Sequence, residues 1–170
     1  MKRALFLLVA AVCGLGLLVG CNNDKNLPSA FYSFVMTGDN PSVIKLGMSN
    51  NDLPGVWGIN ATSPKQNFAI DYIWEDTKTR ENIIALVSTG KVFRTMAGLS
   101  LNNTMADVLP MYQKDTAITV AVNEPKKIVL QKQIDGVNYA MTIRGYDDGA
   151  IKSITVYNAD LYNDDDKNYQ

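Results

Sequence analysis

The chain of 170 residues contains no histidine. This absence excludes Ser-His-Asp and Cys-His catalytic sites, and it excludes every metal site with an imidazole ligand. The most common general base is also missing, so carboxylates, lysines or tyrosines would have to carry any proton transfer. We therefore expect a protein that is not an enzyme and has no catalytic residue, no metal site and no cofactor.

Cysteine is almost as scarce, with Cys13 and Cys21 as the two examples. Cys13 lies in the one long apolar stretch, residues 4–19, which follows Lys2 and Arg3. The stretch is short for a membrane span, which needs about 20 apolar residues, and no polar anchor closes it. The pattern predicts a cleaved export signal over residues 1–20. Its removal would take Cys13 with it and leave no possible disulfide.

The apolar stretch ends in the sequence Leu-Val-Gly-Cys at residues 18–21, which resembles the lipobox of bacterial lipoproteins. This resemblance implies cleavage after Gly20 and a lipid, palmitate included, on Cys21 that anchors the chain to a membrane. The alternative is an ordinary secretory signal with an incidental cysteine. The residue after the cysteine is Asn22 and not an aspartate. This resembles the pattern of lipoproteins that diderm bacteria place in the outer membrane. In a cell with one membrane, the expected location is its outer face.

The rest of the chain has the bulk properties of a small, mildly acidic domain. Without residues 1–20 it has 150 residues, enough for one domain with its own core. Of the charged residues, 14 basic and 17 acidic ones remain, a net charge of −3. Because a nucleic-acid partner requires a basic face, we expect none.

Composition divides this part of the chain into three regions. Residues 21–42 are predicted to form a lipidated tether that ends in a possible leading strand, residues 30–36. Residues 43–158 are predicted to form one domain. Residues 159–170 are acidic and polar, which predicts a flexible tail.

Two segments of the domain share a glycine, an apolar residue and a serine, followed by polar capping residues: 47–49 and 98–100. Glycine permits the turn. Ser49, or one of the Asn and Asp residues after it, could cap the first helix, and Asn103 or Thr104 could cap the second. Asp107 could complete a capping box at the second helix. The pattern predicts two repeats, residues 43–96 and 97–158, each with a short helix.

Strand-like runs follow each predicted helix, and tight turns connect most of them. Ser88, Thr89 and Gly90 predict a hairpin between the second and third runs. The predicted fold class is α+β, with one layer of short helices on an antiparallel sheet. The strand-like runs are residues 67–74, 82–87, 91–96, 117–122, 127–133, 137–144 and 151–157.

The two units, residues 44–58 and 96–112 with the strands after each, resemble small bacterial lipoproteins of the SmpA/OmlA kind. Two such units in tandem resemble the folds of β-lactamase-inhibitor-protein-like domains. This resemblance implies a role in protein–protein interaction in the cell envelope, without catalysis.

Alternation along the strands suggests two surfaces for such a partner. Arg144 and Thr142 should point away from the core, near Gln131 and Gln133, and Arg144 is the first candidate contact. The alternative is a solvated sheet face. In either case, replacing Arg144 with alanine should change stability little. Tyr72 and Trp74, with Phe68 on the same side, form a second candidate surface, or simply the core face of a strand.

Other hypotheses for function belong to different classes. The protein could inhibit an exported enzyme, or it could bind a small ligand in the periplasm. The two Gly-x-Ser segments lack the second glycine of a hydrolase elbow. The acidic runs at residues 147–148 and 164–166 lack the ligand spacing of a calcium loop, so a turn and a solvated tail are expected there.

Overall fold

A computed structural model describes residues 31–36, 42–53 and 70–164. Within these ranges the chain forms nine β-strands, one 3-10 helix and one α-helix. The helical elements are η1 (Asn50–Asp52) and α1 (Met105–Tyr112). The strands are β1 (Ser33–Met36), β2 (Ser42–Lys45), β3 (Ile70–Trp74), β4 (Ile83–Ser88), β5 (Phe93–Thr95), β6 (Thr119–Glu124), β7 (Lys127–Ile134), β8 (Val137–Gly145) and β9 (Ile151–Asn158).

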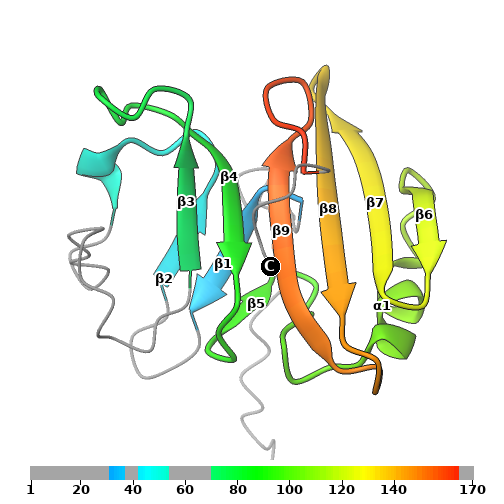
Figure 1. Cartoon of the computed structure of the whole chain (residues 1–170). Coiled ribbons are helices and arrows are strands. Elements are labelled where there is room, and N and C mark those ends of the chain that lie inside the picture. The colour runs from blue at the N-terminus through cyan, green and yellow to red at the C-terminus, as the bar shows by residue number, and fades with distance from the viewer. Residues whose placement is uncertain (1–30, 37–41, 54–69, 165–170) are drawn as a thin grey trace, which may run out of the picture.

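The strands form two antiparallel sheets (Figure 1). The larger sheet has six strands in the order β3-β4-β9-β8-β7-β6, and the smaller has three in the order β2-β1-β5. Both halves of the chain contribute to the larger sheet, because β4 pairs with β9. The predicted α+β layer of several short helices is therefore wrong, since the described chain is mainly β with a single α-helix.

The two predicted helices differ because only one of them has a core to pack against. α1 buries Met105, Val108 and Tyr112, whereas η1 buries no side chain. Short helices are marginal unless tertiary packing stabilises them. The capping signals themselves were correct, because Ser49 with Asp52 and Thr104 with Asp107 each form a capping box.

The resemblance between the two glycine segments is therefore local. Gly47 and Gly98 both have positive φ, 81° and 92°, and each follows an edge strand of the three-stranded sheet. Past the capping boxes, however, one chain segment makes a three-residue turn and the other an eight-residue helix. The tandem helix-plus-strand repeat is not the organising unit of this fold.

The predicted hairpin at residues 88–90 is also wrong. β4 and β5 lie in different sheets, and β5 pairs with β1 instead. Phe93 of β5 is fully buried, so the chain crosses from one sheet to the other in order to place this ring in the core. A Ser-Thr-Gly turn permits either connection, and burial of the aromatic side chain decides between them.

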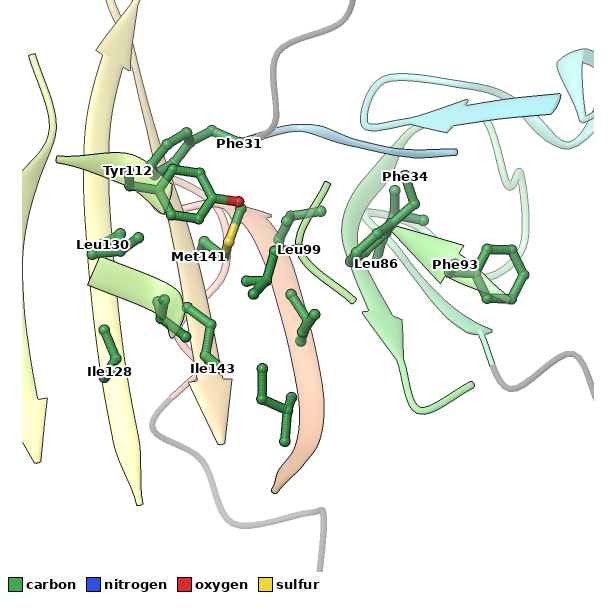
Figure 2. Close-up of a cluster of buried hydrophobic side chains, with 14 of the residues drawn as sticks. Phe31, Phe34, Leu86, Phe93, Leu99, Tyr112, Ile128, Leu130, Met141 and Ile143 are labelled. Atoms are coloured by element: carbon green, nitrogen blue, oxygen red, sulfur yellow. The ribbon is translucent and has the colours of Figure 1, made fainter. Parts of the chain in front are cut away.

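One core fills the space behind the six-stranded sheet. The three-stranded sheet covers the inner face behind β3, β4 and β9, and α1 covers it behind β7 (Figure 1). Figure 2 shows Tyr112 of α1 beside Leu130, and Phe34 of β1 beside Leu86. Most of the inner face is thus committed to packing, which leaves the outer face of the six-stranded sheet for other uses.

Candidate functional site on the outer sheet face

The outer face, which points away from α1 and the three-stranded sheet, carries the four candidate residues of β7 and β8. Gln131 pairs with Ala140 and Gln133 with Asn138, while Thr142 and Arg144 follow at alternate positions of β8. Because side chains alternate between the faces of a strand, all four lie on the same side. The predicted core positions Met141 and Ile143 are fully buried on the other side. The face assignment from the sequence was correct.

Among the described residues, no helix packs on this outer face. Instead, the chain after β9 folds back over it as a short segment, residues 159–164, which we call the strap (Figure 1). Its backbone begins with a hydrogen bond from the amide of Ala159 to the carbonyl of Asn138, at 2.7 Å. The acidic tail was predicted to be flexible from residue 159, but the part of it that the structure describes makes specific contacts. Residues 165–170 lie outside the described ranges.

The strap ends in a largely buried ion pair with Arg144. The guanidinium donates from Nη1 to Oδ2 of Asp164 and from Nη2 to the carbonyl oxygen of Asp164, both at 2.7 Å. The side chain of Asp164 is 2% exposed and that of Arg144 is 23% exposed. Arg144 was predicted to point away from the core as a partner contact or as a solvated residue, whereas the structure shows it engaged within its own chain.

Thr142 lies beneath this covered region and is 1% exposed. Its hydroxyl lies 3.4 Å from that of Tyr157, and Tyr157 packs edge-on against Tyr162 of the strap at 5.6 Å between ring centroids. Ala85, Ala140 and Tyr157 form a small buried cluster on the outer face, against which Tyr162 packs. Thr142 therefore has no direct access to a partner while the strap is in place.

The start of the strap is joined to β8 by a carboxylate–amide contact. Asp160 accepts hydrogen bonds from the backbone amide of Asn138 at 3.0 Å and from its side-chain nitrogen at 2.7 Å. These two bonds, of which the backbone bond has the larger effect, hold the pKa of Asp160 below its ordinary value. The side chain of Gln133 donates to Asn138 at 3.3 Å and continues the polar network onto β7.

An open depression of about 550 Å³ lies beside this network. Its polar lining includes Gln131, Gln133, Asn138 and Asp160, with Thr119 of β6 on the far wall. Gln131 and Gln133 are exposed, and side-chain amides can both donate and accept hydrogen bonds. The two glutamines are thus the candidate contact residues that remain accessible in this structure.

Tyr72 and Trp74 lie elsewhere, half-buried on the core side of β3. Their ring centroids are 6.2 Å apart, and both rings pack against the main core. The buried hydroxyl of Tyr72 has no hydrogen-bond partner, and burial, with a smaller effect of the Asp71 charge, raises its pKa to about 12. Their position favours the interpretation of this strand as a core face. Phe68, predicted to share that face, lies outside the described residues.

The other sequence motifs have structural explanations. Asp148 accepts a hydrogen bond from the amide of Ala150 within the β8–β9 turn, and Gly149 has a φ of 83°. Ser100 hydrogen-bonds to Asn103 ahead of α1. Within the described ranges, no three His, Cys, Asp or Glu residues form a group that could hold a metal ion.

Little in the sequence indicates the residues that hold the strap, namely Asp160, Tyr162 and Asp164. Their charge and their position near the end of the chain indicated a solvated tail. One local signal was available: the side chain of Asn158 accepts a hydrogen bond from the amide of Asp160, as Asn often does in turns.

Comparison with known proteins identifies no relative. No protein-family model matches the sequence, and neither a curated protein nor a solved structure matches it significantly. Among the described residues, no helix has both the length and the apolar character needed to cross a membrane.

Proposed function

We propose that this protein is a lipid-anchored cell-envelope protein that binds another envelope protein, without catalysis, through the outer face of its six-stranded sheet. The N-terminal sequence supports the anchor, since its lipobox-like residues 18–21 place a cysteine directly after an export signal. Cys21 and the residues after it up to residue 30 lie outside the described residues. The anchor would hold the domain at a membrane surface, where its partner is also found.

The observation that carries the binding proposal is the exposed polar part of the outer face on β6, β7 and β8. Gln131 and Gln133 line the depression there, and no described helix packs over them. A sheet face that is needed only for the core would be covered by apolar contacts, as the inner face is. Exposed amides beside a concave surface suit hydrogen bonding to a partner's backbone and polar side chains.

A first experiment tests the anchor. Replacing Cys21 with serine removes the thiol to which the lipid attaches, so the protein should leave the membrane fraction or remain unprocessed. Membrane fractionation with mass measurement of the N-terminus distinguishes the outcomes. Serine-substituted protein that is cleaved normally and still stays in the membrane fraction would contradict lipidation.

A second experiment tests the face. Chemical crosslinking in intact cells, followed by purification of the tagged protein, should recover a partner with the wild-type chain. Replacing Gln131 and Gln133 together with alanine should reduce that recovery about tenfold, because interface residues that matter cost more than about 1 kcal/mol when truncated. Gln113→Ala, at the exposed end of α1 on the opposite side, is the matched control. Equal recovery with all three proteins would place the binding surface elsewhere.

A small ligand is the second candidate, favoured by the depression itself. Its volume of about 550 Å³ lies within the usual range for small-molecule sites of about 300–1,000 Å³. A polar small molecule that binds there should raise the melting temperature of the wild-type protein and not that of the protein with alanine at Gln131 and Gln133.

A further inference from the structure

The strap is attached to the outer face in the manner of a bound peptide. It adds no strand to the sheet. Besides the backbone bond of Ala159, its side chains contact the face at three separated points: Asp160 on Asn138, Tyr162 on Tyr157, and Asp164 on Arg144. Leu161, between the first two points, is 48% exposed. Spaced polar and aromatic anchors with an exposed residue between them are typical of a peptide in a recognition site.

The fit of the strap is incomplete where it is most buried. Oδ1 of Asp164 has no hydrogen-bond partner, and neither has the hydroxyl of Thr155 on β9, although both atoms are buried. Buried polar atoms are normally paired, so two unpaired atoms on the covered part of the outer face are unusual. A segment that pairs with the hydroxyl of Thr155, and whose own carboxylate leaves no oxygen unpaired there, would bind better than the strap does.

We propose that the covered part of the outer face, around Arg144 and Tyr157, is a binding site for an acidic segment with an aromatic residue two positions before a carboxylate. The chain's own strap occupies this site and competes with such a segment in the partner. This inference rests on the proposed function, because it names the chemistry of that partner. Tyr162 and Asp164 of the strap show the pattern that the site accepts.

The covalent connection explains why the strap occupies the site even though its fit is incomplete. It follows β9 directly, so its effective concentration at the site is high, on the order of millimolar for a short connection. A partner segment has to displace the strap. The apparent affinity for that segment is therefore reduced in proportion to the small fraction of molecules in which the site is open. Loosening the strap should therefore strengthen binding of a segment supplied in trans.

The test uses the full mature chain in detergent and a fluorescent, C-terminally amidated peptide of residues 158–164. The amide preserves the carbonyl group that accepts from Nη2 of Arg144. Fluorescence anisotropy should show at least tenfold tighter peptide binding to the Asp164→Asn protein than to the wild type. Tyr162→Ala, which loosens the strap at a different contact, should also increase binding.

Two controls define the site. A peptide with asparagine in place of its final aspartate should bind the Asp164→Asn protein at least tenfold more weakly, and adding Arg144→Ala to that protein should abolish binding. If neither strap variant binds the peptide more tightly than the wild type, while both remain folded by circular dichroism, the proposal is wrong. Failure to recover an envelope partner despite peptide binding would contradict only the proposed function.

Discussion

Arg144 was expected to be a partner contact or, alternatively, a solvated residue, and in both cases its replacement by alanine was expected to leave stability nearly unchanged. The structure predicts a loss of stability instead. Arg144→Ala removes both hydrogen bonds to Asp164. Exposed ion pairs contribute about 0–1 kcal/mol, but here the carboxylate is 2% exposed and the guanidinium 23%. Removing one partner of a buried pair, with the other left in place, costs about 3–5 kcal/mol.

The strap can limit this loss by leaving the sheet, which returns Asp164 to water. Detachment gives up the two hydrogen bonds to the exposed Asp160 and the Tyr157–Tyr162 contact, of which the ring contact contributes about 0.5–1.5 kcal/mol. Detachment therefore keeps the loss at the lower end of the range for a buried pair. We expect Arg144→Ala to lower the free energy of unfolding by about 3 kcal/mol.

Urea denaturation followed by tryptophan fluorescence and circular dichroism measures this loss. Arg94→Ala is the matched control, since Arg94 is exposed on β5 and surface substitutions of this kind change stability by about 0.5 kcal/mol or less. If Arg144→Ala is as mild as Arg94→Ala, the ion pair contributes nothing and the reasoning about its burial is refuted.

Two further predictions concern the core. Burial raises the pKa values of Tyr72 and Tyr112 to about 12, so the neutral phenols contribute stability that is complete below pH 10 and is lost as pH rises through 12. Absorbance and circular dichroism measured together over this range should show that tyrosine ionisation is coupled to unfolding. Normal titration of both groups near pH 10 in the folded protein would contradict this prediction. Gly145→Ala would place a Cβ 2.5 Å from Cγ of Met105, so it should lower the free energy of unfolding, measured by urea denaturation, by about 1–3 kcal/mol. Met105→Ala should lower the free energy of unfolding less in the Gly145→Ala protein than in the wild type. Additive losses would show that the two residues do not interfere.

Much of the strand pattern could be predicted from the sequence, because alternation directly reports which side of a strand is buried. The runs at residues 127–133, 137–144 and 151–157 correspond closely to β7, β8 and β9. α1 was found because its capping box marks where it begins. These are local signals, and the structure retains them.

The errors arose where the outcome depends on contacts between distant residues. No residue near positions 88–90 indicates that Phe93 packs in the core between the two sheets, so the turn was predicted to be a hairpin. A cap and a glycine predict where a helix can begin, but only packing determines whether it continues, as α1 does and η1 does not.

The candidate site was predicted in part for the same reason. Alternation placed Gln131, Gln133, Thr142 and Arg144 on one face, which the register confirms. It could not show that Asp164, twenty residues after Arg144, returns to pair with it. An acidic chain end resembles a solvated tail unless its partner on the sheet is known.

The central claim is that the outer face around β7 contacts another envelope protein. Site-specific photo-crosslinking in living cells tests it most directly, with a photoreactive amino acid at Gln131 and, as the control, at Lys78 in the exposed turn between β3 and β4. We predict a discrete crosslinked product of one envelope protein from position 131 and none from position 78. Crosslinks from position 78 alone, or from neither position in cells where the protein is folded and anchored, would contradict the account.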